Sequence, residues 1–293
     1  MTARSYLYVP GDQSSKLERA LDRGADALVL DLEDGVAVSA KDTARETVAA
    51  FLATGPTGPE LWVRVNADRL DDDLPAVATA TVAGVLIPKA EPALLARADA
   101  LLTAAEQDVG LAPGSLRVIP LIETARGLLA VAELARGPRV LRLGIGEADL
   151  AAELGIRPGP DRAELAPHRA ALVVASAAAG LAAPIAPVET DLSMSDTELA
   201  ERTRALLREG FRARTAIHPR QVPVINTVFT PSEDEIAEAR DIVARLEEAE
   251  RNGSGVAVDR RGRMIDEAVA RSAREVLARA GAVAVRAATR DGG

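Results

Sequence analysis

Short apolar segments alternate with helix-like segments along most of this chain, and this alternation limits the possible folds more than any other feature. Eight segments of strand length are each followed by a helical pattern, and they lie at residues 5–9, 27–30, 61–65, 84–87, 118–122, 140–145, 184–188 and 214–217. Such repetition over roughly 220 residues is typical of an α/β fold, the TIM (β/α)8 barrel. A doubly wound sheet is the main alternative, but residues 10–12 (Pro-Gly-Asp) are not its glycine-rich phosphate turn. We therefore predict a TIM barrel.

A C-terminal helical extension follows the last predicted strand. We assign residues 1–230 to the barrel and residues 231–293 to the extension. Ser232 and Glu235 predict a capping box at the start of a charged helix that runs to residue 251. A turn and a short strand follow, and then a last helix is expected to end near Gly281, with a frayed tail beyond it. Because no linker-like sequence precedes residue 231, we expect the extension to pack on the barrel or on a neighbouring subunit.

Composition excludes several classes of function. The net charge is −9 and aromatic residues make up 2% of the chain, so neither a basic surface nor a stacking platform for nucleic acid is expected. The uncharged stretch 170–188 is broken by Gly180, Pro184 and Pro187, which predicts a buried helix and a strand rather than a membrane span. No cysteine is present, which removes thiolate chemistry. Residues 1–13 lack the pattern of a signal peptide, so a cytoplasmic enzyme is the expectation.

Two carboxylates stand at the ends of neighbouring predicted strands. Glu123 directly follows the strand at 118–122, and Asp149 lies just beyond the strand at 140–145. Because the carboxyl ends of adjacent parallel strands open onto one face, both side chains are expected to point into the same cavity. Two such carboxylates repel each other unless a cation or a shared proton lies between them. We interpret the pair as a magnesium site.

Other strand ends also carry polar residues that suit a site. Asp31, Glu33 and Asp34 follow the second strand, and a plain solvated turn is a weaker explanation for three acids there. Arg64 lies within the strand segment WVRVN (62–66), where an apolar residue is expected; it could form a structural ion pair, but a clamp for a substrate carboxylate is the favoured interpretation. His218, after the last strand, is by itself best read as a core histidine.

Lysine is almost absent from this chain. Of 35 basic residues only Lys16, Lys41 and Lys89 are lysines, because arginine fills the other basic positions. Where arginine is used so consistently, a remaining lysine is either a chance surface residue or a position where a compact ammonium charge is needed.

With these motifs in place, the chain resembles the citrate lyase β-subunits and CoA-ester lyases (citramalyl-CoA and malyl-CoA lyases) of the HpcH/HpaI aldolase superfamily. The resemblance runs from Arg4 to about Ala280 and rests on the order and spacing of several segments, which read RSYLYVPG (4–11), DLEDGV (31–36), VRVN (63–66), PK (88–89), LIET (121–124), GEADL (146–150), IHPRQ (217–221) and GRMID (262–266). Two departures are modest: Ala186 stands where many relatives have aspartate, and Glu267-Ala268-Val269 lacks a proline often found there.

The resemblance implies a TIM barrel that binds Mg2+ through Glu123 and Asp149, with Arg64 polarising a substrate oxygen. It further implies that Asp266 reaches the site of a neighbouring subunit in a homotrimer or hexamer and acts with Arg64 as a catalytic residue. The residues expected to bind substrate are Arg64, Glu123, Glu33, Asp34 and Lys41.

The implied reaction is magnesium-dependent cleavage, or formation, of a carbon–carbon bond in a 3-hydroxyacyl thioester such as citramalyl-, malyl- or citryl-CoA. The products are an acetyl thioester and a 2-keto acid. The sequence leaves open whether the acyl carrier is CoA or a carrier protein, which keto acid is used, and whether the thioester is also hydrolysed. The alternatives are a metal-dependent aldolase of free 2-keto acids and a non-catalytic scaffold or regulatory barrel.

Overall fold

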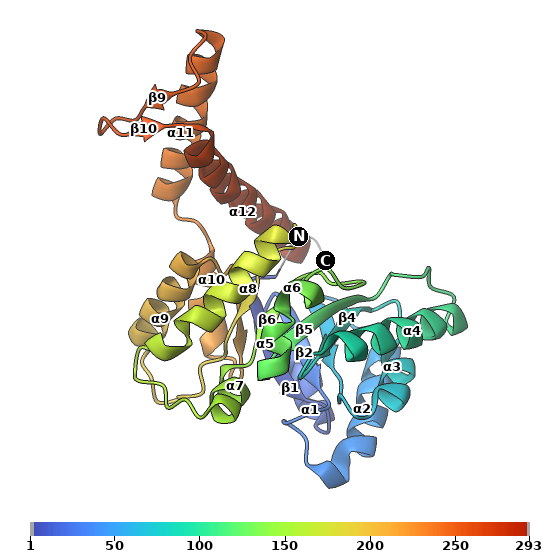
Figure 1. Cartoon of the computed structure of the whole chain (residues 1–293). Coiled ribbons are helices and arrows are strands. Elements are labelled where there is room, and N and C mark those ends of the chain that lie inside the picture. Colours follow the sequence, from blue (N-terminus) through green and yellow to red (C-terminus); the bar gives the residue numbers. More distant parts are fainter. Residues whose placement is uncertain (1–2, 292–293) are drawn as a thin grey trace. The chain divides into compact units, whose positions relative to one another are not determined.

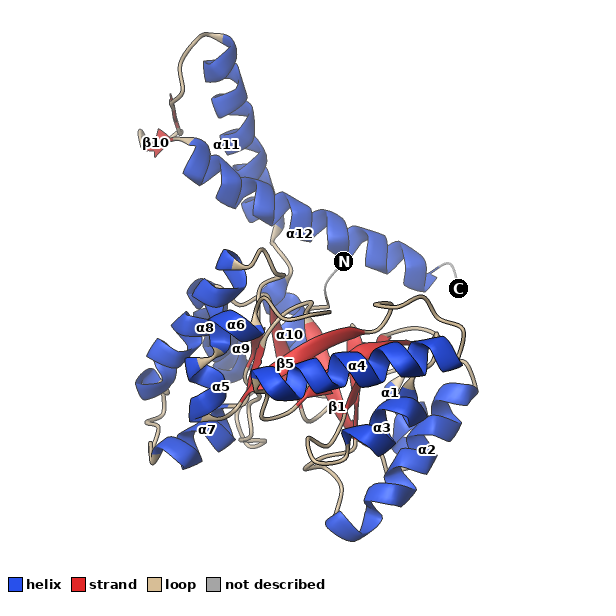
Figure 2. Ribbon diagram, turned by 45° about the vertical axis from the view of Figure 1, so that its right-hand side comes forward, coloured by secondary structure: helices blue, strands red, loops and turns tan. Residues whose placement is uncertain are grey.

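Eight parallel strands close into a barrel in chain order, as the alternating sequence predicts (Figures 1 and 2). The computed structural model describes residues 3–291, so the outermost ends of the two predicted segments, 1–2 and 292–293, lie outside it. Strand β1 pairs with both β2 and β8, which closes the barrel. The strands are β1 (Ser5–Pro10), β2 (Ala27–Asp31), β3 (Glu60–Arg64), β4 (Val82–Ile87), β5 (Arg117–Ile122), β6 (Gly144–Ile145), β7 (Ile185–Ala186) and β8 (Ala213–Ala216). The predicted TIM barrel is confirmed.

Helices cover the outside of this barrel, and apolar side chains fill its inside. The helices are α1 (Ser14–Ala20), α2 (Lys41–Ala53), α3 (Leu70–Val77), α4 (Pro92–Asp108), α5 (Ala125–Leu129), α6 (Val131–Leu134), α7 (Glu147–Leu154), α8 (Ala166–Ala178), α9 (Asp196–Glu209) and α10 (Gln221–Phe229), with 3-10 turns at Val38–Ala40 and Ala163–Leu165. One buried cluster includes Val29, Trp62, Ile119 and Leu121. Alternate residues of a strand point to the same side, so these positions define the inward face.

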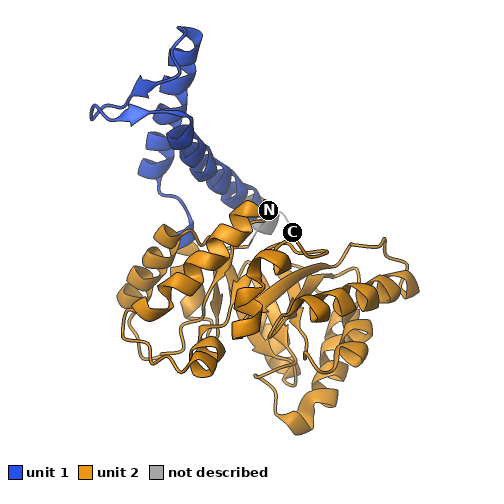
Figure 3. Ribbon diagram, in the orientation of Figure 1, with its two compact units in different colours: residues 1, 228–293 blue, residues 2–227 orange. Residues whose placement is uncertain are grey.

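The chain separates into two compact units, shown in different colours in Figure 3. The barrel unit ends at Thr227, and the second unit runs from Val228. The second unit contains α11 (Glu233–Arg251), a hairpin of β9 (Ala257–Val258) and β10 (Met264–Ile265), and α12 (Glu267–Asp291). Ser232 and Glu235 form the predicted capping box. A small core of Leu246, Ile265 and Ala270 joins α11 to the hairpin and α12.

Three differences from the sequence-based expectation are larger than one or two residues. The sixth strand is shorter than predicted, because Val140 makes only an isolated bridge to Val118. The helix expected over 125–135 is two short helices that meet at Ala130, whose backbone (φ −91°, ψ 7°) leaves the helical region. The last helix does not end near Gly281 but continues to Asp291, so the prediction of a frayed tail there was wrong. A glycine inside a helix costs only about 1 kcal/mol, which the neighbouring alanines offset.

Among the described residues, no helix combines the length and the apolar character needed to cross a membrane.

Candidate active site

The inward face of the barrel changes from apolar to charged at the carboxyl ends of its strands. Asp31 lies two residues after the core residue Val29, on the same face of β2. Arg64 lies two residues after the core residue Trp62, on the same face of β3. Glu123 likewise lies two residues beyond the core residue Leu121. A cavity of about 390 Å3 opens here, and its wall includes Tyr8, Asp31, Asp34, Gly35, Arg64, Glu123, Gly146, Glu147, Asp149, Val188, Thr215 and Ile217.

The guanidinium of Arg64 is fixed by carboxylates of the chain itself. Its Nε and Nη2 atoms donate to the two oxygens of Asp31 at 2.7 and 2.6 Å. Its Nη1 atom lies 2.8 Å from Glu33 Oε2 and 3.4 Å from Asp34 Oδ2. The same guanidinium lies over the ring of Tyr8, 4.8 Å from the ring centre. The fork geometry expected for Arg64 is therefore present, but it grips Asp31.

Asp31 also shapes the loop that follows β2. Its oxygens accept hydrogen bonds from the backbone N–H groups of Glu33 (3.0 Å) and Gly35 (2.9 Å). Lys41 Nζ donates to the backbone carbonyls of Leu32 at 2.8 Å and Glu33 at 2.5 Å. Lys41 thus orders the acidic loop and does not line the cavity, and its predicted contact with substrate stays a prediction.

Lys89 connects two acidic residues of the site, a role that was not predicted for it. It follows β4 with a left-handed backbone (φ 48°), which is uncommon for a residue with a side chain. Its backbone N–H donates to Glu123 Oε2 at 2.9 Å, and its Nζ donates to Glu33 Oε1 at 2.6 Å. Strained backbone of this kind concentrates at functional sites, and here it aims one residue at both carboxylates.

Glu123 is buried, with 4% of its surface exposed. Burial raises the pKa of Glu123 to about 7, and the negative charges of Glu33 and Asp149 also raise it. Gly146 allows this placement, because a Cβ atom at this position would lie 2.3 Å from Glu123 Oε1. Lys89 and Gly146 therefore hold the carboxylate from two sides.

Asp149 lies in the first turn of α7 and lines the same cavity. Its side chain is exposed, and among residues 3–291 it has no hydrogen-bond or ion-pair partner. No cluster of three or more His, Cys, Asp or Glu side chains suited to a metal is found in that range, and the pairing of Glu123 with Asp149 on a metal ion stays a prediction. Two carboxylates on one cavity fit Mg2+, which keeps several waters and needs few protein ligands.

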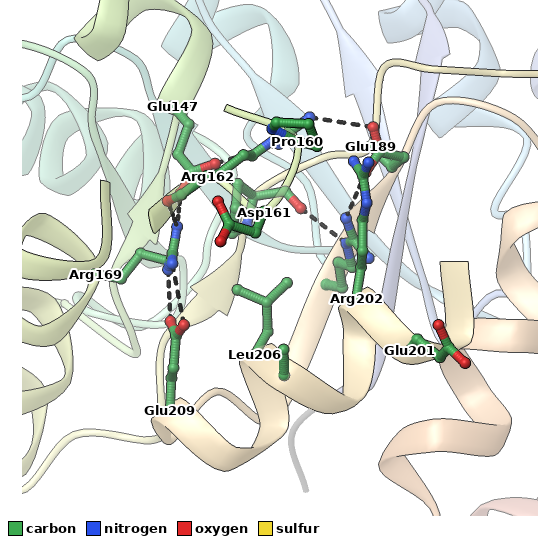
Figure 4. A pocket seen from close by; sticks show the side chains of 13 residues that line it. Glu147, Pro160, Asp161, Arg162, Arg169, Glu189, Glu201, Arg202, Leu206 and Glu209 are labelled. Atoms are coloured by element: carbon green, nitrogen blue, oxygen red, sulfur yellow. Dashed lines mark hydrogen bonds and ion pairs between the residues drawn. The ribbon is translucent and has the colours of Figure 1, made fainter. Parts of the chain in front are cut away.

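A partly buried network of ion pairs involves Glu147, the first residue of α7 (Figure 4). Glu147, the first residue of α7, pairs with Arg169 at 2.7 Å and with Arg162 at 3.2 Å. Arg162 also pairs with Glu189 at 3.1 Å, and Arg169 pairs with Glu209 at 2.5 Å. The network fixes the helix turn that carries the second predicted metal ligand. Sequence reasoning missed it, since its members are up to 62 residues apart, from Glu147 to Glu209.

Two predicted residues are not among those that line this cavity. Asp266 belongs to the second unit, where its Oδ1 accepts a hydrogen bond from Val269 N at 3.0 Å and caps α12. His218 is exposed and its Nδ1 accepts a hydrogen bond from Arg220 N at 3.2 Å, so it is not the core histidine that we expected.

Comparisons with known proteins agree with this geometry. Residues 4–219 match the model of the family described as HpcH/HpaI aldolase/citrate lyase. The chain is 33% identical to citrate lyase subunit beta of Leuconostoc mesenteroides subsp. cremoris, over 94% of this chain and 92% of that protein. It is 37% identical to (3S)-malyl-CoA thioesterase of Cereibacter sphaeroides, with 96% and 95% covered.

A solved structure is similar over nearly the whole chain. CitE from Mycobacterium tuberculosis, in complex with magnesium, acetoacetate and coenzyme A, matches with a TM-score of 0.75 and 32% identity. The match covers 95% of this chain and 98% of that one. The chain belongs to the HpcH/HpaI aldolase/citrate lyase family and is a lyase of that family.

Proposed function

We propose that this protein is a magnesium-dependent carbon–carbon lyase that cleaves, or forms, a 3-hydroxyacyl thioester. The products of cleavage are an acetyl thioester and a 2-keto acid. The observation that carries the proposal is the placement of Arg64, Glu123 and Asp149 around one cavity at the carboxyl ends of the barrel strands. The names of the relatives, a citrate lyase subunit and a malyl-CoA thioesterase, and the magnesium and coenzyme A bound to CitE support it.

Glu123 and Asp149 would hold Mg2+ in this proposal. They offer only oxygen ligands, and the pKa of Glu123 is raised to about 7 first by burial and then by the negative charges of Glu33 and Asp149, so a bound cation would favour its ionised form. When bound, the ion supplies a Lewis acid that polarises the oxygens of the keto acid. Lys89 and Gly146 then serve as positioning residues, since the first donates to Glu123 and the second leaves room for it.

Cleavage moves electrons from a hydroxyl to a thioester. The hydroxyl O–H loses its proton and becomes the keto oxygen as the carbon–carbon bond breaks. The bond electrons pass to the thioester enolate, whose CH2 carbon takes up one proton and becomes the methyl group, so the proton released from the hydroxyl is balanced by the one gained at carbon. Arg64 places a fixed positive charge at the buried end of the cavity, where charge develops on oxygen, and Asp31 prevents the guanidinium from turning away.

Proton transfer at the methyl carbon needs a group outside the metal site, and we assign it to Asp266 of a neighbouring subunit. This assignment requires a homo-oligomer, a trimer or hexamer, in which the second unit of one subunit closes the cavity of another. A carboxylate with a partly exposed side chain is suited to exchanging a proton with an enolate carbon.

The decisive experiment incubates the protein with Mg2+, acetyl-CoA and one keto acid at a time, namely oxaloacetate, pyruvate or glyoxylate. Mass spectrometry of the CoA species should show one 3-hydroxyacyl-CoA, and chelation with EDTA should stop its formation. Release of free CoA with the hydroxy acid would identify hydrolysis as a later step, the activity named for the Cereibacter relative. Products that form without any thioester would instead support an aldolase of free keto acids, and no product at all would support a non-catalytic barrel.

A further inference from the structure

Strand β1 contributes one polar side chain to the wall of the candidate active site, that of Tyr8. Tyr8 lies two residues after Tyr6, which belongs to the buried core of the barrel, so both side chains are on the inward face of β1. They are the only two tyrosines of the chain. No step of the reaction described above uses either of them.

The two tyrosines differ in what their hydroxyl groups contact. An arginine lies over each ring: Arg142 is 5.7 Å from the ring centre of Tyr6, and Arg64 is 4.8 Å from that of Tyr8. The Tyr6 hydroxyl accepts a hydrogen bond from Arg142 Nη1 at 3.4 Å. Within residues 3–291 the Tyr8 hydroxyl has no hydrogen-bond partner, and solvent reaches its oxygen. This hydroxyl is therefore available to a ligand.

The other side-chain donors of the cavity wall are already engaged. Apart from carboxyl groups, the side chains there that can donate a hydrogen bond are those of Tyr8, Arg64 and Thr215. Each guanidinium nitrogen of Arg64 faces a carboxylate within residues 31–34. The Thr215 hydroxyl donates to the backbone carbonyl of Ala186 at 3.3 Å. Tyr8 thus supplies the one uncharged donor of this wall that is not committed to the protein.

We propose that the Tyr8 hydroxyl donates a hydrogen bond to the carbonyl oxygen of the substrate thioester. The inference rests on the proposed function and adds a catalytic residue to it. As the carbon–carbon bond breaks, this oxygen becomes the enolate oxygen and gains negative charge. A donor already directed at it therefore stabilises the transition state more than the bound substrate.

The thioester oxygen is the substrate atom that still needs a partner. Arg64 and the predicted metal site account for the oxygens of the keto acid, and Asp266 is assigned to the methyl carbon. Burial raises the pKa of Tyr8, so its hydroxyl keeps its proton and remains a donor at the pH of catalysis. A neutral donor can stabilise an enolate oxygen without adding charge to the site.

NMR of the full-length protein with a carbon label at tyrosine Cζ tests this contact without turnover. Two resonances are expected, and Tyr6→Phe and Tyr8→Phe assign them. Acetyl-CoA with Mg2+ should shift the Tyr8 resonance and leave that of Tyr6 in place. S-ethyl-CoA, which has CH2 in place of the carbonyl group, is the matched ligand and should shift the Tyr8 resonance much less.

Tyr8→Phe tests the effect on catalysis, because it keeps the ring against Arg64 and removes only the hydroxyl. We expect kcat to fall about 100-fold, as for the loss of a donor to a developing oxyanion. The Kd for Mg2+ should not change, and the Tm should not fall, since no hydrogen bond within the protein is lost. Tyr6→Phe is the matched control on the same face of β1. It should keep kcat close to the wild-type value but lower the Tm, because Arg142 loses a partner.

Three results would overturn the inference. They are a Tyr8 resonance that S-ethyl-CoA shifts as much as acetyl-CoA does, wild-type kcat in Tyr8→Phe, and a rise in the Kd for Mg2+ that parallels the fall in kcat. The last result would show that Tyr8 acts by supporting the site and not by contacting the thioester. A wild-type protein whose Tyr8 resonance responds to the acetyl group but that forms no product would refute only the proposed function. Product formed at the wild-type rate by Tyr8→Phe would refute only this inference.

Discussion

Replacing Gly146 by alanine is the cleanest way to disturb the predicted magnesium site without changing its charge. Gly146 precedes α7 with φ −104° and ψ 89°, a backbone that alanine can adopt. The added methyl group is therefore the only perturbation. It would lie 2.3 Å from Glu123 Oε1 and 2.6 Å from Glu123 Cγ.

The size of the effect follows from these distances. Carbon atoms in contact lie about 3.5 Å apart or more, so the Glu123 carboxylate must move by about 1 Å. Mg2+ requires ligand oxygens near 2.1 Å in close to octahedral geometry, and a shift of about 1 Å typically costs about 100-fold in activity. We expect Gly146→Ala to raise the Kd for Mg2+ about 100-fold, or about 2.7 kcal/mol. Overpacking should lower the free energy of unfolding by about 1–3 kcal/mol, so the variant still folds.

Mg2+ titration calorimetry and turnover, with circular dichroism as a check on folding, test this expectation. Gly159→Ala is the matched control, because it makes the same change in the α7–α8 connection where the nearest atom to a new Cβ is Glu164 Oε1 at 3.4 Å, an ordinary contact. That variant should bind Mg2+ as wild type does. If the Kd of Gly146→Ala for Mg2+ were within about threefold of the wild-type value, the packing of Glu123 against Gly146 would not affect metal binding.

Further substitutions separate the roles of the other residues. Arg64→Lys should lose most activity in a folded protein, since lysine cannot hold Asp31 through two parallel hydrogen bonds; normal turnover would make Arg64 structural only. Lys89→Met should lower kcat/KM about tenfold and barely change the affinity for Mg2+, because the backbone N–H of residue 89 still donates to Glu123. An equal loss of kcat/KM and Mg2+ affinity would contradict this expectation. Asp266→Asn keeps a good helix cap and should bind Mg2+ and keto acid but not exchange methyl protons. Mixing it with Glu123→Ala subunits should restore some activity, and no rescue despite subunit exchange would end the shared-site proposal.

Much of the site could be predicted from the sequence, because two regular repeats place its residues. The strand–helix repeat predicts the closed parallel barrel, and the period of two within each strand puts residues such as Asp31 and Arg64 on the inward face beyond an apolar core. Parallel strands bring all their carboxyl ends together, so Glu123 and Asp149 meet at one cavity although 26 residues separate them. These inferences need only local pattern and the closure of the barrel.

The rest depends on tertiary geometry that no local pattern reports. Nothing in the sequence around Lys89 predicts its left-handed backbone, and this conformation lets one residue contact two carboxylates. The sequence suggests a clamp at Arg64, but only the structure identifies Asp31 as the carboxylate it holds. The break at Ala130 contains neither glycine nor proline, so the sequence predicts one continuous helix there.

The charge of the site leads to a last prediction, on stability. Burial, together with the nearby carboxylates of Glu33 and Asp149, raises the pKa of Glu123 from 4.5 to about 7. A raised pKa means that ionised Glu123 destabilises the metal-free fold. The free energy of unfolding therefore falls as pH rises from 4.5 to 7. Above pH 7 the loss is complete and amounts to about 3 kcal/mol.

At pH 8 a bound cation should offset this cost. Mg2+ at 100 times its Kd would stabilise the fold by about 2.7 kcal/mol, and because each kcal/mol raises the Tm of a chain of this length by a little under about 2 °C, a rise of about 4 °C is expected. Glu123→Gln should melt higher than metal-free wild type and gain nothing from Mg2+, because its amide removes both the repulsion and the ligand. Equal melting of the wild type with and without Mg2+ would mean that the carboxylates do not share an ion, and that the family resemblance at these two positions does not extend to the metal.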